Sequence, residues 1–426
     1  MQDTDGRAAP IPPTESGAVR LSWKEPAGIL ALSIVNFLLR IMTLGVYHFW
    51  GKTEVRHRIW SSARLNGEPL AYTGTGRELL MGFVLVFAVV VLPTAVLSFV
   101  AALILGPSGI GVIQLMVMLV FYYLTGVAIH RAQRYRLTRT EWRGIRGGMS
   151  GNAWRFGWTY LWTAFLIPLS LGWIIPWRAT KLQSRLTNDM RFGNRPFQFA
   201  AVSGPLYPRF VFLWIGSFFT LALIGATIFT AVLPLGLNPA TLEQGVPPSP
   251  NKLMLLGAMV YGLMFVGFLI YAMLSAWYRA GVMNHFAAHT SFEGARFQGS
   301  ATAPSMIRLA VGNFFILVIG AAVAGALTST VLGIGVLGVV AATGGWSDGA
   351  LGLPQWVLQA IPTLTLIVVV AGFGALVPVT QTRSARYFVQ RLSLNGTIPL
   401  AAIGQAAKDD IKRGEGLAQA FDVDAF

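Results

Sequence analysis

The sequence predicts an all-α polytopic membrane protein with internal repeats and with short β-strands in its cytoplasmic loops. Composition is the first reason, because 54% of the 426 residues are hydrophobic and only 12% are charged, whereas soluble chains carry roughly 25% charged residues. The second reason is that several uninterrupted apolar runs reach the roughly 20 residues with which a helix crosses a bilayer. The third is a stretch of sequence that recurs along the chain.

The recurring stretch begins at the end of an apolar segment and continues through a basic run to a glycine-containing turn. Its first copy, residues 43–70, returns at 170–197 after a shift of 127 residues without a gap, and again at 374–399 after a further shift of 202. We interpret the chain as repeats of one unit. The residues that mark the copies are Gly45, Trp50, Pro69, Gly172, Trp177, Pro196, Gly374 and Pro378.

The net charge of +15 indicates orientation rather than nucleic-acid binding, because Lys and Arg mark the cytoplasmic side of membrane proteins. The absence of cysteine excludes disulfides and thiolate sites. Residues 1–24 are polar and proline-rich and lack the pattern of a signal peptide. We therefore expect a disordered lead-in at 1–24 and a polar cytoplasmic tail at 401–426.

Residues 25–400 are predicted to form one repeat-built membrane domain. Its apolar hairpins have weakly charged connections, and most Lys and Arg residues lie in the loops at the opposite ends. The positive-inside rule then places the basic loops and the C-terminus in the cytoplasm. Six full spans are expected at about 79–105, 111–130, 210–237, 253–278, 309–342 and 354–380.

Two further apolar segments, 27–50 and 156–177, have basic sequence at both ends. A plain span there would place one basic loop outside, against the charge bias. The third copy resembles the second with two full spans inserted near its middle, and a segment that tolerates this has both ends on one face. We therefore predict bent or interfacial segments, with bends at Gly45 and at Pro168 and Gly172. The rival interpretation is two plain spans, which gives eight crossings and an external N-terminus.

The stretch at 43–70, together with the motif WRGIR at 142–146, resembles the YjgN-like family of bacterial inner-membrane proteins, a domain-of-unknown-function family. The resemblance covers about residues 25–400. It implies a multi-pass protein of the bacterial cytoplasmic membrane with no established activity, cofactor or catalytic residue. Gene neighbourhood in the family implies a partner membrane enzyme such as a metallopeptidase. The apolar insertion in the third copy departs from the family pattern and adds spans.

Asn36 and Arg40 lie four residues apart inside the first apolar segment, so they share one face of a helix. A charge at membrane depth costs several kcal/mol unless it is paired, hydrated or able to snorkel to the interface. Asn313 occupies a comparable position in the third copy. These three residues are the candidate lining of a polar cavity. The alternative is that Arg40 lies near the interface or binds carbonyls at the bend.

An arginine-rich run with interleaved aromatic residues is a second candidate. Basic stretches beside a span attract anionic headgroups at about 1 kcal/mol per charge, and tryptophan prefers that depth. We expect membrane lipids to be partners through anionic headgroups at the cytoplasmic face, and a specific anion or protein site is the alternative. The residues are Arg131, Arg134, Arg136, Arg139, Trp142, Arg143 and Arg146.

Two other motifs do not predict chemistry. His285 and His289 are spaced like helical metal ligands, but Glu293 is the only nearby carboxylate. The run 333–338 matches GxGxxG in letters only and lies in an apolar span, where small residues favour helix packing. We predict no catalytic residue, no cofactor, no metal site, no nucleic-acid partner and no enzyme activity.

Two functions stay open. Internal repeats with broken apolar segments are typical of transporters, which predicts a permease or channel-like protein for a small or anionic solute. The alternative is a non-catalytic membrane scaffold that binds anionic lipid or a partner membrane enzyme such as a metallopeptidase. A dry, packed interior around Asn36 and Arg40 favours the scaffold, and a water-filled path favours transport.

Overall fold

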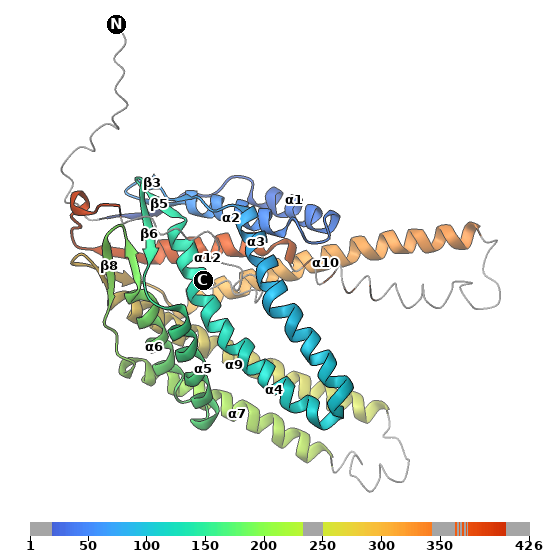
Figure 1. The fold of residues 1–426 in the computed structure, drawn as a ribbon. Helices are drawn as coiled ribbons and strands as arrows, with labels where there is room; N and C mark the ends of the chain where they lie inside the picture. The colour runs from blue at the N-terminus through green and yellow to red at the C-terminus, as the bar shows by residue number, and fades with distance from the viewer. Residues whose placement is uncertain are drawn as a thin grey trace.

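Helices dominate the computed structural model (Figure 1), which describes residues 19–232, 250–342 and 374–405 and the single positions 363, 366, 369 and 372. Most of the predicted lead-in, sixth span and tail lies outside the described residues. The prediction of a helical multi-pass membrane protein is confirmed. Within the described ranges, five helices are long and apolar enough to cross a membrane: Gly76–Ile104, Ile110–Thr138, Gly204–Thr227, Gly257–Ala288 and Ala303–Gly335.

The first two long helices form a hairpin. α3 (Gly76–Val86) is preceded by its N-cap residue Thr75, whose hydroxyl accepts a hydrogen bond from the amide three residues later. The π-helical segment η1 (Phe87–Val91) leads into α4 (Leu92–Thr138), which is broken at Gly106 with φ 63° and ψ −174°. Gly106 stands directly before a proline. Glycine adopts positive φ freely, and proline disfavours the helical conformation in the residue before it, so both residues favour a break here.

Three further long helices lie side by side. The 3₁₀ turn η2 (Gly204–Leu206) leads into α7 (Tyr207–Val232), which packs along α9 (Pro250–Ala288). α9 in turn packs on α10 (Ala303–Ala342). Glycine allows α7 and α9 to approach closely, since a Cβ on Gly267 would overlap a threonine side chain of α7.

Two short helical pairs begin in the segments 27–50 and 156–177, which the sequence predicts to be bent, and their second helices continue into the basic loops (Figure 1). α1 (Ile29–Met42) packs on α2 (His48–Ser62), and α5 (Ala153–Leu169) packs on α6 (Ile175–Asn188). With 14 and 17 residues, α1 and α5 are about 21 and 26 Å long, which is shorter than the roughly 30 Å hydrocarbon core. The chain therefore bends in both segments, and the side on which their ends lie stays a prediction.

The turns within the two pairs have the same backbone. Leu44 and Leu171 both have φ 50°, and the following Gly45 and Gly172 have φ 91° and 85°. Each glycine N–H donates to the carbonyl five residues earlier at 2.7 Å, which is the Schellman arrangement. The hydroxyl before each leucine donates to a carbonyl of the last helical turn, also at 2.7 Å. These bonds satisfy the backbone internally, as membrane depth requires.

The strands are short and antiparallel, and they gather at one end of the long helices (Figure 1). One sheet has the order β11-β10-β9-β8-β7-β6-β5-β4 and the other β1-β2-β3. The strands are β1 (Leu21–Trp23), β2 (Ala63–Leu65), β3 (Glu68–Pro69), β4 (Ala71–Tyr72), β5 (Thr140–Trp142), β6 (Ile145–Met149), β7 (Met190–Phe192), β8 (Arg195–Phe199), β9 (Thr290–Phe292), β10 (Ala295–Gly299) and β11 (Leu392–Asn395).

Left-handed residues close several of the hairpins between these strands. Asn66 and Gly67 have φ 50° and 82°, and Arg143 and Gly144 have φ 51° and 77°. Two consecutive residues with positive φ are typical of a type I′ turn, whose twist matches that of paired strands. The turn signals in the basic loops therefore mark hairpins.

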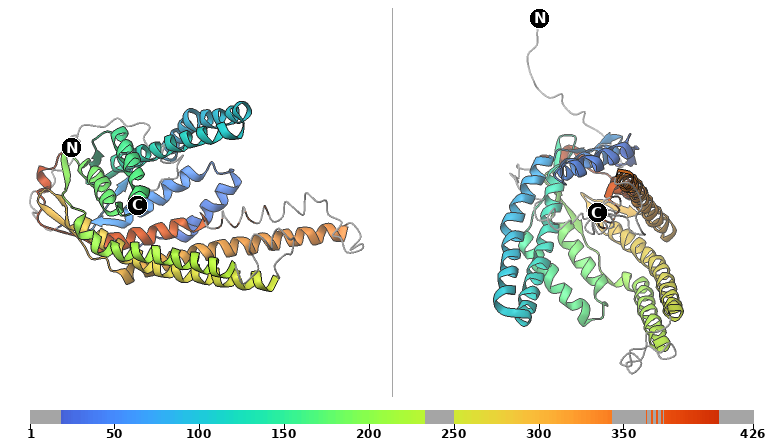
Figure 2. Two further views of the ribbon diagram at one scale, coloured as in Figure 1. Left: turned by 90° about the horizontal axis from the view of Figure 1, so that it is seen from below. Right: turned by 90° about the vertical axis from the view of Figure 1, so that its right-hand side faces the viewer.

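The first and last described strands lie together. β1 contacts β11, and α12 (Val377–Arg391) packs against α1, β1 and α10. Glu25 and Arg386 form an ion pair of 2.5 Å between the β1–α1 connection and α12. The right-hand view of Figure 2 shows the helical groups spread in an arc. The hydrophobic core at the sheet comprises Val19, Phe292, Ala295, Leu394, Ile398 and Ile403.

Candidate functional site

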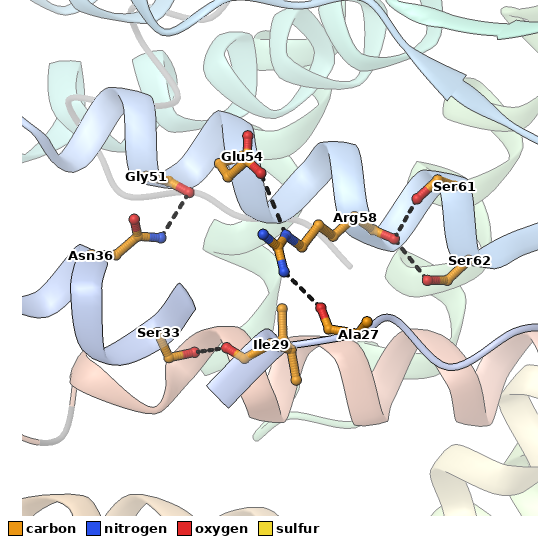
Figure 3. Close-up of polar contacts among 9 residues, drawn as sticks. All are labelled: Ala27, Ile29, Ser33, Asn36, Gly51, Glu54, Arg58, Ser61 and Ser62. Carbon is orange, nitrogen blue, oxygen red and sulfur yellow. Dashed lines mark hydrogen bonds and ion pairs between the residues drawn. The ribbon is translucent and has the colours of Figure 1, made fainter. Parts of the chain in front are cut away.

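Asn36 is buried between the two helices of the first short pair, with 2% of its surface exposed. Its Nδ2 donates to the carbonyl of Gly51 on α2 at 3.3 Å (Figure 3). Gly51 makes room for this contact, because a Cβ there would lie 3.1 Å from Cγ of Asn36. The Oδ1 of Asn36 has no hydrogen-bond partner within the described chain. The amide thus joins α1 to α2 and keeps one acceptor unused.

Arg58 on α2 connects this helix to the residues just before α1 (Figure 3). Its Nη1 donates to the carbonyl of Ala27 at 2.6 Å, and its Nε donates to Oε1 of Glu54 at 3.4 Å. On α1, the hydroxyl of Ser33 donates to the carbonyl of Ile29 at 2.8 Å. The polar groups of this pair therefore contact other parts of the same pair.

Thr163 takes the place of Asn36 in the second pair, 127 residues later, and is fully buried. The Nε of Arg178 on α6 donates to the Thr163 hydroxyl at 3.2 Å. The Nη2 of Arg178 donates to the hydroxyl of Tyr122 and to the carbonyl of Tyr160, both at 3.3 Å. Arg178 corresponds to Gly51 in the repeat, so both pairs place a polar contact at the same position.

Asn313 lies on α10 and contacts α12, a helix that follows it by more than sixty residues. Its Nδ2 donates to the Ser384 hydroxyl at 3.2 Å, and its Oδ1 accepts a hydrogen bond from Nε of Arg383 at 3.2 Å. Both the nitrogen and the oxygen of the Asn313 amide are thus hydrogen-bonded to α12.

The three candidate cavity residues are not joined by a described hydrogen bond. Arg40 is half-buried in the last turn of α1, and its carbonyl accepts the hydrogen bond from Gly45. Asn36 and Asn313 each face the neighbouring helix of their own pair. All three residues lie on α1 or α10, and both of these helices pack against α12. Their role in lining a cavity stays a prediction.

Carboxylates pair with three arginines of the basic run. Arg139 Nη2 lies 2.9 Å from Oε1 of Glu78, and Arg146 Nε lies 3.4 Å from Oε2 of Glu141. Arg143 donates to both oxygens of Glu68, at 2.6 and 2.9 Å. The hydrogen bond from Arg143 lowers the pKa of the Glu68 carboxyl below its ordinary value of 4.5. The three pairs join the end of α4 to α3, β5 to β6, and the β5–β6 turn to the β2–β3 hairpin.

The rest of the run also makes internal contacts. Arg131 stacks over the ring of Trp154 at 5.2 Å. Arg136 is 8% exposed and donates to Oε1 of Gln133 at 2.9 Å. Trp142 is buried in the sheet with 5% exposure. Arg134 lies on the same helix, α4. Much of the run is therefore used to hold α4 and the sheet together, and a lipid contact by its remaining members stays a prediction.

The prolines of the repeated motif occupy equivalent strand positions. Pro69 lies opposite Arg64 in the β2–β3 pair, and Pro196 lies opposite Arg191 in the β7–β8 pair. The two registers are therefore identical after the shift of 127 residues. Proline fits here because a hairpin strand end has a position whose N–H does not enter the ladder.

The other marker residues agree in part. Trp50 and Trp177 both lie in the first turn of the second helix of their pair, and Pro378 lies in the first turn of α12. Gly374 differs from Gly172, because Gly374 lies in a helical turn and lacks the left-handed φ. The third copy therefore lacks the left-handed glycine that the other two copies share at this position.

Sequence reasoning missed two buried polar contacts. His130 on α4 is fully buried, and its Nε2 lies 3.2 Å from Oδ2 of Asp189 at the end of α6. The hydroxyl of Tyr135 donates to Oε2 of Glu78 at 2.6 Å. The chain has only 17 Asp and Glu residues, so a lone acid beside an apolar span indicates that the acid has a partner, but it does not indicate which residue that partner is. Within the described ranges, no group of three or more His, Asp or Glu residues could hold a metal ion.

The chain matches, over residues 28–420, the family described as "Bacterial protein of unknown function (DUF898)". The chain belongs to this family. It is also similar to the inner membrane protein YjgN of Salmonella typhimurium, with 26% identity over 140 residues. That alignment covers 33% of this chain and 32% of the length of YjgN. No solved structure matches the chain.

The family match agrees with the resemblance that the sequence motifs indicate. The five apolar helices and the similarity to an inner membrane protein support a location in the bacterial inner membrane. The DUF898 chain is therefore a multi-pass inner-membrane protein whose activity must be proposed from its geometry.

Proposed function

We propose that the protein is a non-catalytic membrane scaffold, which holds a partner membrane protein between its helical arms. The observation that carries this proposal is the exposure of the five apolar helices. In the most apolar 18-residue stretch of each helix, only 6% to 17% is buried inside the molecule. The arms are the α3–α4 hairpin and the α7–α9 hairpin with α10, which extend from the strand-bearing end in an arc (Figure 2).

Exposed apolar surface has a defined meaning in a membrane. Lipid tails are as apolar as leucine, so exposing an apolar side chain to lipid costs no free energy. Leu103 on α4 is 71% exposed, Phe229 on α7 is 73% exposed and Tyr261 on α9 is 74% exposed. Helices exposed on most sides leave room for foreign helices beside them, which supports a role in holding a partner.

The polar contacts of the helical pairs also support a structural role. Asn36, Thr163 and Asn313 each contact the adjacent helix of their pair, and such polar contacts join helices in membranes. A solute path needs polar groups that face one another across a shared space. The partner that we propose is a membrane enzyme such as a metallopeptidase, in keeping with the resemblance drawn from the sequence.

Site-specific photocrosslinking in native membranes tests the scaffold proposal. A benzophenone side chain at Leu103 or Phe229 should form a covalent adduct with one discrete membrane protein, and the same protein should appear from both arms. A benzophenone at the fully buried Met149 is the matched control and should give no such adduct. If both arm positions yield adducts with lipid alone, the scaffold proposal is wrong.

A permease is the second candidate, and the unused Oδ1 of Asn36 is the observation that favours it. Polar side chains inside membrane segments often mark the path of a substrate or ion. In proteoliposomes loaded with a small anion, Arg40→Leu and Asn36→Leu should each abolish flux if the protein transports. The scaffold proposal predicts no flux above empty liposomes for the wild type and for both variants.

A further inference from the structure

A cavity of about 310 Å³ lies where α7 begins beside the last turns of α9. Its volume is at the lower end of the roughly 300–1,000 Å³ that is typical of small-molecule sites. Arg209 from α7 lines it, together with Tyr278, Asn284 and His285 from α9. No carboxylate lines the cavity, so its charge is positive.

Arg209 supplies this positive charge. Its guanidinium lies over Gly281, where a Cβ would overlap Nη1, and 5.8 Å from the ring centre of Trp277. Within the described chain, no carboxylate lies within ion-pair distance of Arg209. This differs from Arg139, Arg143 and Arg146, whose charges are balanced by glutamates. A guanidinium without an acid partner is suited to bind an anionic oxygen.

Tyr278 supplies a second, independent sign of a ligand. The residue is only 8% exposed, and its hydroxyl has no hydrogen-bond partner among the residues that the structure describes. Buried hydroxyl groups are almost always hydrogen-bonded, because leaving one unpaired is unfavourable. Tyr278 lines the cavity, so an anionic oxygen bound there can accept the hydrogen bond that the hydroxyl lacks.

The remaining walls are held in place before any ligand binds. The ring of His285 donates through Nε2 to the carbonyl of Val202 at 2.8 Å. The amide of Asn284 donates to the carbonyl of Ala301 and accepts from its N–H, both at 2.8 Å. The N-terminal end of α7 adds the positive end of a helix dipole. The cavity is therefore formed in advance of binding.

The position of the cavity indicates which anion can reach it. Arg209 lies near the start of the span Gly204–Thr227, and Tyr278 lies near the end of Gly257–Ala288. The strand β8 precedes α7 in the chain, and His285 of the cavity wall contacts Val202, three residues after the end of that strand. The end of a span beside polar structure is at the depth of lipid headgroups, where aromatic residues such as Trp277 are favoured.

We propose that this cavity binds the phosphate group of an anionic phospholipid, with Arg209 and the Tyr278 hydroxyl as the donors. The scaffold proposal does not require this site, and the site does not require a protein partner. Free inorganic phosphate offers the same oxygens, so the test includes it as a separate arm.

Native mass spectrometry of the full-length protein in detergent tests the proposal. Phosphatidylglycerol, diacylglycerol and inorganic phosphate are added separately, and bound fractions are measured. Arg209→Gln should weaken phosphatidylglycerol binding about fivefold, since one cation near a headgroup contributes about that factor. Tyr278→Phe should weaken it about two- to fivefold, and diacylglycerol should not bind at the site. Arg279→Gln is the matched control, because Arg279 is exposed on α9 and does not line the cavity.

The outcomes separate the sources of the phosphate. Binding of phosphatidylglycerol alone supports a lipid site, and competition by inorganic phosphate supports a site that recognises the phosphate group itself. Gel filtration and melting midpoints like those of the wild type show that the variants fold. If Arg209→Gln and Arg279→Gln weaken binding equally while Tyr278→Phe has no effect, the binding is general charge attraction and the proposal is overturned.

Discussion

At the scale of single residues, two leucines hold a backbone conformation that L-amino acids avoid. Leu44 and Leu171 each have φ 50°, which costs roughly 1–2 kcal/mol for a residue with a side chain. Leu44 is 96% exposed and Leu171 is 64% exposed, so packing inside the molecule does not offset this cost. An apolar side chain at each tip is suited to lipid, and this fits a bend that lies at membrane depth.

The first prediction concerns this strain. Leu44→Gly should leave the melting midpoint in detergent unchanged or raise it slightly, because glycine adopts positive φ freely but also gains freedom in the unfolded chain. Leu38→Gly, in the middle of α1 and 52% exposed, should lower stability by about 1 kcal/mol. Equal losses from the two substitutions would show that the turn has no left-handed strain.

The second prediction concerns the contact between Asn36 and Gly51. Gly51→Leu should destabilise the protein by about 1–3 kcal/mol, because the new side chain must displace the buried amide. Gly111→Leu is the matched control, since a Cβ on Gly111 meets no atom within 4 Å. Thermal unfolding followed by circular dichroism measures both. A Gly51→Leu variant as stable as the control would mean that α1 and α2 do not pack as described.

At the scale of elements, one carboxylate joins the two helices of the α3–α4 hairpin. Glu78 accepts hydrogen bonds from Tyr135 at 2.6 Å and from Arg139 at 2.9 Å, and its amide is capped by Thr75. One acid thus fixes the start of α3 against the end of α4. The i,i+4 pair of Glu54 with Arg58, at 3.4 Å, lies on one helix and joins fewer parts of the chain.

The third prediction compares these two acids. Glu78→Ala should cost about 1–3 kcal/mol of stability, because it removes the carboxylate that accepts the hydrogen bonds from Tyr135 and Arg139. Glu54→Ala should cost less than about 0.5 kcal/mol, as is usual for exposed helical ion pairs. Chemical or thermal unfolding in detergent distinguishes the two losses. Similar small losses from both would show that Glu78 does not hold the hairpin.

The helices and turns were predictable because their signals are local. The bend at Gly45 and Gly172, the Gly106 break and the type I′ turns each depend on a few adjacent residues. The polar contacts between helices were not predictable, because Asn313 and Ser384 are 71 residues apart and His130 and Asp189 are 59 apart. Such pairs depend on which helices become neighbours, and no residue spacing encodes that.

At the scale of the whole molecule, the strands form one end and the apolar helices form the rest (Figure 1). The order of the strands in each sheet follows their order in the chain. The last strand, β11, contacts the first strand, β1. This arrangement agrees with bent pairs whose two ends lie on the same side. The resemblance between copies extends into the strand registers of the β2–β3 and β7–β8 hairpins, although these two hairpins lie in different sheets.

The side on which the hairpins lie is the central claim, and cysteine labelling measures it most directly. The chain has no cysteine, so single cysteines at Asn66, Asn194 and Ser108 can be compared in intact cells with a membrane-impermeant maleimide. We predict that Asn66→Cys and Asn194→Cys stay unlabelled until the cells are opened, whereas Ser108→Cys is labelled at once. Labelling of only one of the two hairpin positions in intact cells would contradict the account, because the α5–α6 pair would then cross the membrane.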